Sequence, residues 1–163
     1  MLIDRSDLII QHFVYLIKEY DFIIENKEFD PSSMGNAFVI FKSSRVGIEI
    51  VIDRNQVLIA LGDQTEPREN WLDYNDVLHY FAPLEVAYSN LDKLFDEKRA
   101  NNRSNTDTWD EVLEFQLNRV GFMLRRYCEP ILKGDLSMIK DIKEIEEKRV
   151  TEMLKRWNNP PIN

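Results

Sequence analysis

Cysteine is nearly absent from this 163-residue chain, which contains one, Cys128. A single cysteine cannot form a disulfide within the chain, so a disulfide framework is excluded and a reducing cytoplasm is the expected environment. Long apolar runs are absent too, because none approaches the ~20 residues of a membrane-spanning helix. The N-terminal MLIDRSDLII has acidic residues early and no small-residue cleavage site after an apolar run, so we expect no signal peptide. These absences predict a cytoplasmic protein that does not enter a membrane.

Glycine is scarce and scattered. The glycines are far apart in the sequence, so neither a P-loop nor the GxGxxG pattern of dinucleotide-binding proteins is present. They are Gly35, Gly47, Gly62, Gly121 and Gly134. Cradles of backbone N–H groups for phosphate are therefore not expected. HExxH, CxxC and the EF-hand loop are also missing, which removes the usual metal-ligand spacings, and the sequence predicts neither a cofactor nor a metal.

Nucleophilic catalysis has little support in the residues that would carry it out. Cys128 with His12 or His79 would supply the thiol and the base that such a mechanism needs. However, Cys128 stands just before Pro130 at the end of an amphipathic stretch, and free cysteine is among the most buried residue types. The two histidines stand alone, without a spacing that points to catalysis. We predict that the chain is not an enzyme.

Basic residues are too few for general binding to nucleic acid. The chain has 21 Lys and Arg against 29 Asp and Glu, a net charge of −8. Nucleic-acid binding needs Lys and Arg to displace counterions from phosphates, so this class of partner is not expected. An acidic chain is compatible with a basic protein partner, although acidity also serves solubility.

Three apolar runs rich in Val and Ile occupy residues 37–61, AFVIFKSSRVGIEIVIDRNQVLIAL. Strand-forming residues bounded by turn residues at this spacing predict an antiparallel meander. The polar breaks at 43–45 and 53–56 are too short for the helical crossover that parallel strands need. A further short strand is predicted over 22–27, and residues 29–36 have loop composition. The sheet would then have about four strands.

Apolar residues at helical spacing flank these strands. A first helix is predicted over 3–20, and Asp73 is a good N-cap for a short helix through Phe81. Pro83 suits the first position of another helix. Residues 98–106, KRANNRSNT, form the most linker-like segment and are predicted to be an exposed joint between two halves.

Two longer helices are predicted in the C-terminal part. Thr108 and Glu111 fit a capping box at the start of the first one. Pro130 is expected to end or kink that helix. Phe115 and Phe122 lie off its apolar stripe, so burial on more than one side is expected.

The last helix is predicted from Asp135 to about Trp157, after Gly134 at the C′ position of the preceding turn. Several of its apolar residues recur at helical spacing and are expected to point inward. They are Ile139, Ile142, Ile145, Val150, Met153 and Trp157. The two long helices would form an antiparallel hairpin against the sheet or the first helix, or serve for self-association.

The predicted fold class is α+β. It combines an N-terminal helix, an antiparallel meander sheet of about four strands and a helical C-terminal half with a long helix pair. The expected organisation is a sheet domain or subdomain over 1–97, a linker over 98–106, a packed helical hairpin over 107–157 and a disordered tail over 158–163.

A metal-dependent hydrolase or nuclease with a degenerate motif is the enzymatic alternative. Restriction-endonuclease-like nucleases, whose core this order of elements resembles, place an acid on one strand and an acid-x-Lys on the next to hold a divalent metal. Glu49 and Asp53 would supply acids, but the strand over 56–61 has neither acid nor lysine. Glu25 and Lys27 have the acid-x-Lys form ahead of the meander, in the wrong order.

Acidic residues concentrate between Asp53 and Glu85. This segment holds seven acids against two arginines, a net charge of −5, together with four aromatic residues. Rim charges raise association rates and aromatic anchors supply affinity, so the segment is a candidate surface for a basic partner. The candidate binding residues are Asp63, Glu66, Glu69, Trp71, Asp73 and Asp76. The alternative is that Trp71 belongs to the core and that the acids are solvated turn and cap residues.

Two stretches resemble small bacterial immunity-type proteins: WLDYNDVL at 71–78, after the meander, and PILKGDL at 130–136, in the helical part. Immunity-type proteins neutralise secreted or contact-delivered toxins in the producing cell. They are commonly acidic and mask the active site of a toxin without being enzymes. The resemblance implies a cytoplasmic, non-enzymatic module that binds a basic, toxin-like protein. A structural or regulatory homodimer is a third alternative.

Overall fold

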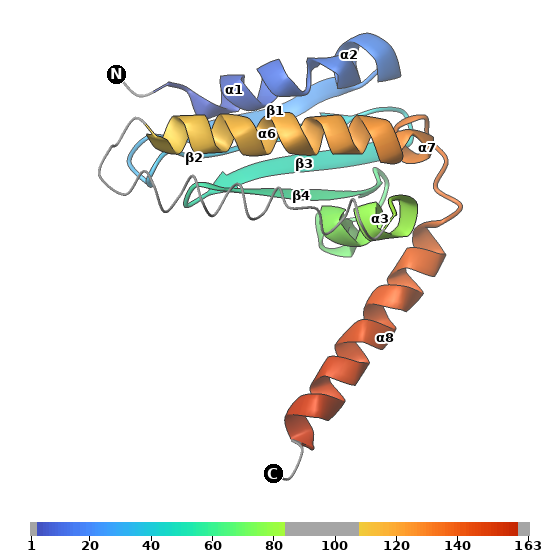
Figure 1. Ribbon diagram of the computed structural model, residues 1–163. Coiled ribbons are helices and arrows are strands. Elements are labelled where there is room, and N and C mark those ends of the chain that lie inside the picture. The colour runs from blue at the N-terminus through green and yellow to red at the C-terminus, as the bar shows by residue number, and fades with distance from the viewer. Residues whose placement is uncertain (1–2, 84–107, 160–163) are drawn as a thin grey trace.

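A five-stranded antiparallel sheet, in the order β1-β2-β3-β4-β5, organises the residues that the computed structural model describes, 3–83 and 108–159. Its strands are β1 (Ile23–Asp30), β2 (Asn36–Lys42), β3 (Val46–Asp53), β4 (Gln56–Asp63) and β5 (Leu72–Asp73). Helices precede and follow this sheet in the chain, and most of them cover one of its sides (Figure 1). The predicted α+β class is confirmed.

The predicted meander is confirmed as β2, β3 and β4. Asp53 pairs with Gln56 at the end of the β3–β4 hairpin. The two residues between them both have positive φ, 49° at Arg54 and 65° at Asn55. Two successive left-handed residues are typical of a type I′ turn, whose twist matches that of the paired strands. This break is therefore a tight two-residue turn, and the pairing is antiparallel.

Strand β1 is longer than predicted. The sequence predicts a strand over 22–27 and a loop over 29–36, whereas β1 continues to Asp30. Phe29 packs against the core, so tertiary burial extends the strand through a residue that begins a loop by composition. The sheet has a fifth strand because β5, two residues long, pairs with β4.

The hydrophobic core lies between the sheet and the helices α1 (Arg5–His12), α2 (Val14–Tyr20) and α6 (Thr108–Tyr127). We call the side of the sheet that these helices cover the core face. Alternate residues of the central strands are fully buried there, as expected for the two-residue period of a strand. They are Val39, Phe41, Ile48, Ile50, Ile52 and Leu61.

The sequence predicts one helix over 3–20, and the structure has two, because Phe13 leaves the helical conformation with φ −115° and ψ 17°. Phe13 is fully buried, and α6 approaches the junction at Gly121. A Cβ atom on Gly121 would lie 3.3 Å from the carbonyl oxygen of His12. The Tyr15 hydroxyl donates a 2.8 Å hydrogen bond to the Gly121 carbonyl. The break thus coincides with a close helix crossing that a local pattern does not reveal.

Pro130 ends the long helix as predicted. Helix α6 stops at Tyr127, and Pro130 occupies the first turn of the short helix α7 (Glu129–Leu132), where its missing N–H costs no helical hydrogen bond. Gly134 follows with φ 92°, the left-handed conformation that glycine favours after a helix. Phe122 is 64% exposed, so the predicted burial of α6 on more than one side is wrong at this residue.

Helix α8 (Ile139–Asn158) does not form the predicted hairpin with α6. It begins at Ile139 instead of Asp135 and extends away from the body, on the side of the sheet opposite α1 and α6 (Figure 1). Of the residues predicted to point inward, Ile142 is buried and Ile139 is half-buried. The others are exposed: Ile145, Val150, Met153 and Trp157. The periodicity is that of a helix with one apolar face, but the tertiary structure leaves most of that face unpacked.

The short helix predicted after Asp73 is α3 (Tyr74–Phe81). As its N-cap, the Asp73 carboxylate accepts a 2.7 Å hydrogen bond from the backbone N–H of Asn75. The helix predicted after Pro83, the linker over 98–106 and most of the C-terminal tail lie outside the described residues.

Cys128, between α6 and α7, is fully buried, and its burial raises the pKa of the thiol to about 12. The thiolate is the reactive form of cysteine. We therefore expect Cys128 to react with a disulfide reagent near pH 8 at least about 100-fold more slowly in the folded protein than in concentrated guanidinium chloride. A spectrophotometric thiol assay measures both rates. Equal rates would contradict a closed α6–α7 junction.

Candidate protein-binding face

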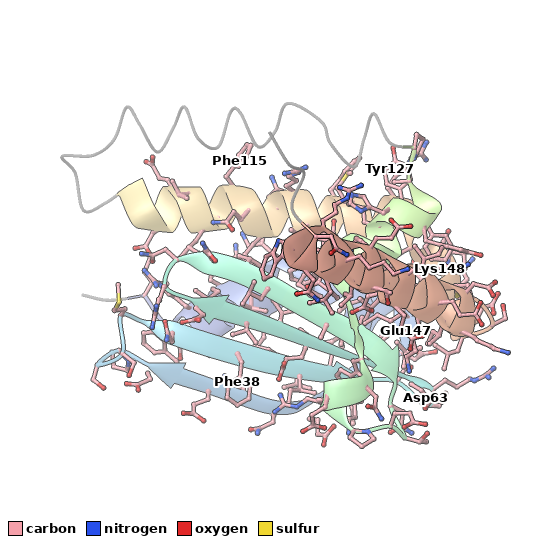
Figure 2. The ribbon with its side chains drawn as sticks, turned by 90° about the horizontal axis from the view of Figure 1, so that it is seen from below. Phe38, Asp63, Phe115, Tyr127, Glu147 and Lys148 are labelled. Atoms are coloured by element: carbon pink, nitrogen blue, oxygen red, sulfur yellow. The ribbon has the colours of Figure 1, made fainter. Side chains whose placement is uncertain are left out.

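The second face of the sheet, opposite the core face, is apolar at its centre. Strand pairing puts Phe38, Val51 and Leu58 in one row across β2, β3 and β4. In the next row Ile40 and Ala60 lie on either side of Glu49. An antiparallel sheet with one solvated face normally carries polar side chains there. Here Leu58 is 49% exposed, and Phe38 and Val51 are half-buried. Figure 2 looks onto this face, with Phe38 labelled.

Acidic side chains surround the apolar centre. Strand pairing and ion pairs assign six acids and two bases among the described residues to the second face, a net charge of −4. The acids are Glu25, Glu28, Asp30, Glu49, Asp53 and Asp73, and the bases are Lys42 and Arg68. Both bases are engaged, because Lys42 lies 2.7 Å from Glu25 and Arg68 forms an ion pair with Glu49. The negative charge of the face therefore comes from the acids outside these two pairs.

Local hydrogen bonds hold two of these acids. The Asp30 carboxylate accepts a 2.6 Å hydrogen bond from the Ser32 hydroxyl, which lowers the pKa of Asp30. The Asp53 carboxylate accepts a 3.1 Å hydrogen bond from the side-chain amide of Asn36. Glu28 is exposed at the β1 edge of the face, opposite Phe38 in the strand register. The acidic rim is therefore built into the hairpins that form the sheet.

Trp71 holds the loop that borders one end of the second face. Its indole ring lies against Gly47 and Gly62, whose missing side chains leave room for it. The indole Nε1–H donates hydrogen bonds to the carbonyl oxygens of Asp63 (2.9 Å) and Glu66 (3.2 Å). Trp71 is 8% exposed, so it does not present its ring to solvent. Its role in the structure is to set the path of the acidic loop.

Three of the predicted binding residues lie on this loop. Asp63 accepts hydrogen bonds from the hydroxyl (2.7 Å) and the backbone N–H (2.8 Å) of Thr65, and the hydroxyl is the main reason that the pKa of Asp63 is lowered. Glu66 and Glu69 are exposed, and Glu69 lies in the one-turn helix η1 (Arg68–Asn70). Glu66 and Glu69 thus add negative charge in the loop that Trp71 holds.

The remaining two acids differ from each other. Asp73 is exposed and pairs with Ala60 in the sheet, so it belongs to the second face. Asp76 has a side chain that is 9% exposed and lies 2.6 Å from Arg149 of α8. That ion pair anchors α8 to α3 and removes Asp76 from the surface that a partner reaches. The structure therefore brings three of the predicted residues to one end of the face: Glu66, Glu69 and Asp73. The strand register puts Asp63 on the core-face side of β4, opposite Val46.

The apolar centre of the face is absent from the sequence-based candidates, which stress the acidic segment after the meander. Glu28, Phe38 and Leu58 were not among them. The signal lies in the strands themselves, because residues 37–41 and 57–61 are apolar at every position. A strand that is apolar at every position cannot alternate between a buried and a solvated face. This pattern predicts cover on both sides of the sheet.

The residues considered for metal-dependent catalysis do not converge. Glu49 is in an ion pair with Arg68, and Asp53 lies four positions further along β3, about 13 Å away for an extended strand. Lys27 lies 3.1 Å from Asp7 of α1, away from the second face. Within the described part of the chain, no group of three or more His, Cys, Asp or Glu side chains is placed to hold a metal ion.

Comparisons with known proteins assign no family to this chain. No protein-family model, curated protein or solved structure matches it. Among residues 3–83 and 108–159, no helix combines the length and apolar character needed to cross a bilayer. We therefore infer the function from the geometry and charge of the second face.

Proposed function

We propose that this protein is a non-enzymatic protein-binding module whose second sheet face docks a basic protein. One observation carries the proposal: an apolar centre of Phe38, Val51 and Leu58 lies inside a rim with a net charge of −4. Protein interfaces combine a desolvated apolar centre with a polar rim in this way. Glu66 and Glu69 extend the rim at the end where Trp71 holds the loop.

A partner that fits this face carries Lys or Arg around an apolar or aromatic anchor. Complementary charge accelerates encounter and sets orientation, while the desolvated anchor supplies most of the affinity. The face is built on paired strands, so little ordering is needed on binding and little entropy is lost.

Within this class we propose an immunity-type role, in which the protein masks the active site of a basic, toxin-like protein. Support comes from the resemblance of residues 71–78 and 130–136 to bacterial immunity-type proteins and from the net charge of −8. The first of these stretches contains Trp71, which holds the acidic loop, and Asp73, which belongs to the second face. The residues that carry the resemblance therefore also build part of the candidate face.

Reversing two rim charges tests the proposal. We expect the variant Glu28→Lys, Glu69→Lys to bind the basic partner at least about tenfold more weakly at low salt, because attraction at two rim positions becomes repulsion. The difference should shrink as salt rises to ~0.15 M and above, where screening acts within ~8 Å. Calorimetric titration with a purified basic toxin protein measures binding. Growth protection against that protein measures the immunity role.

The matched control is Glu111→Lys, Glu114→Lys, which changes the net charge equally at two exposed residues of α6. Helix α6 covers the core face, so this variant should bind like the wild type (Figure 1). Equal weakening by both variants would show that only total charge matters and would overturn the proposed face. Binding without growth protection would support the docking face and overturn the immunity role.

A further inference from the structure

Helix α8 presents a second apolar surface to solvent. Its C-terminal half exposes Val150 (40%), Met153 (45%), Leu154 (48%) and Trp157 (73%). Steps of three and four residues separate these positions, so they form one stripe along the helix. Most of the stability of a protein helix comes from packing of such a stripe, and here that packing is missing among the described residues.

The start of α8 is anchored, so the stripe projects from a defined position. Ile142 is buried, and Arg149 lies 2.6 Å from Asp76 of α3. Beyond this anchor, the helix extends away from the body on the side of the second sheet face (Figure 1). The free half of α8, residues 150–158, therefore points away from its own sheet and is exposed to solvent.

The free half of α8 and the second sheet face have opposite charges. The free half contains two bases, Lys155 and Arg156, and one acid, Glu152, a net charge of +1. Lys148 lies just before it, and Arg149 is neutralised by Asp76 of its own chain. The second face has a net charge of −4 around an apolar centre. Each surface offers apolar area together with the charge that complements the other.

We propose that this protein forms a two-fold symmetric dimer in which the free half of α8 from each copy lies on the second sheet face of the other. Trp157 and Met153 are the anchors, and Phe38 and Leu58 are the residues that they cover. A two-fold axis repeats every contact, so the interface contains two helix-on-sheet contacts. This doubling brings a contact made by one short helix toward the roughly 1,200–2,000 Å² buried by stable interfaces. A basic partner docking on the same face has to displace α8.

Sedimentation velocity on the full chain alone tests the dimer, independently of any other partner. We expect the wild type to be a dimer that dissociates on dilution. Trp157→Glu on α8 and Leu58→Lys on the sheet should each raise the dissociation constant at least about tenfold, because each puts a charge into a desolvated contact. The matched control is Phe122→Glu, which changes a 64% exposed apolar residue of α6 and should leave the dimer unchanged.

Leu58→Lys separates this arrangement from pairing of two α8 helices with each other. A dimer lost with Trp157→Glu but kept with Leu58→Lys would overturn the helix-on-sheet contact. A wild type that stays monomeric at all concentrations would overturn the dimer, yet it would leave the rim-charge experiment with the basic partner unaffected. The two proposals therefore fail separately.

Cross-linking with a short bis-maleimide gives a second readout. Cys128 is fully buried, so introduced cysteines react without competition from it. A mixture of the single variants Met153→Cys and Leu58→Cys should give a covalent dimer, because α8 of one copy reaches the sheet of the other. Cross-linking of Met153→Cys alone, with none in the mixture beyond that level, would overturn the proposal in favour of helix–helix pairing.

Discussion

Gly47→Ala is expected to lower the free energy of unfolding by about 2–3 kcal/mol, although it adds a single methyl group. The new carbon would lie 2.2 Å from Cη2 and 2.3 Å from Cζ2 of Trp71, well inside contact distance. The ring cannot rotate away from the clash, because its Nε1–H donates hydrogen bonds to the carbonyl oxygens of Asp63 and Glu66. The substitution therefore displaces Trp71 together with the acidic loop. Urea denaturation measures the loss.

Repeating Gly47→Ala in a Trp71→Ala background distinguishes the clash with the indole from an effect of the alanine on the backbone of β3. Trp71→Ala alone should cost about 3–5 kcal/mol through lost burial. In that background, Gly47→Ala should be neutral or stabilising by up to ~1 kcal/mol, because alanine is preferred over glycine inside a strand. The double-mutant cycle should thus show a large coupling energy. Additive costs would contradict the contact and assign the role of Gly47 to its backbone.

Arg5→Met is expected to cost about 2–4 kcal/mol. Arg5 is 5% exposed, and its guanidinium donates hydrogen bonds to the carbonyl oxygens of Met34 (3.0 Å) and Gly35 (3.2 Å) in the turn between β1 and β2. Methionine keeps much of the volume but no donor, so both carbonyls lose their partner and α1 loses its tie to this turn. Thermal and urea unfolding both report the change.

Substituting Asp110 distinguishes the two interactions of Arg5, its hydrogen bonds to the two carbonyls and its ion pair with Asp110. Its carboxylate is 3.5 Å from the guanidinium and its side chain is 40% exposed, so solvent screens the pair. Asp110→Asn should therefore cost less than about 1 kcal/mol. Arg5→Met should cost nearly the same with or without Asp110→Asn. A coupling energy above ~1.5 kcal/mol would contradict the carbonyl contacts as the main role of Arg5.

The features that the sequence predicts correctly have local causes. The β3–β4 turn, the Asp73 cap and the stop at Pro130 each depend on a few adjacent residues and on steric or hydrogen-bonding preferences that act within one turn. In the candidate site, too, one part has a local cause and the other depends on tertiary structure. The position of its acidic loop was predicted from charge density, whereas the apolar centre at Phe38 and Leu58 needed the strand register to bring it together.

Long-range packing accounts for the features that the sequence analysis missed. The periodicity of α8 is that of an amphipathic helix, but periodicity alone does not say what covers the apolar stripe. The predicted hairpin assumed a partner within the chain, and the structure instead ties α8 to α3 through Asp76 and Arg149. For Trp71 the sequence left open whether the ring belongs to the core or to a binding surface. Its burial depends on two glycines on neighbouring strands, Gly47 and Gly62.

By itself, the sequence determined the α+β class, the antiparallel meander and the concentration of acid after it, because these follow from local propensity and composition. The tertiary structure alone decided that one sheet face is covered by α1 and α6 while the other keeps an apolar centre inside an acidic rim. It also decided that the basic C-terminal end of α8 is exposed on the side of the second sheet face. The physical reason is that the contacts which bury or expose a face join residues far apart in the chain.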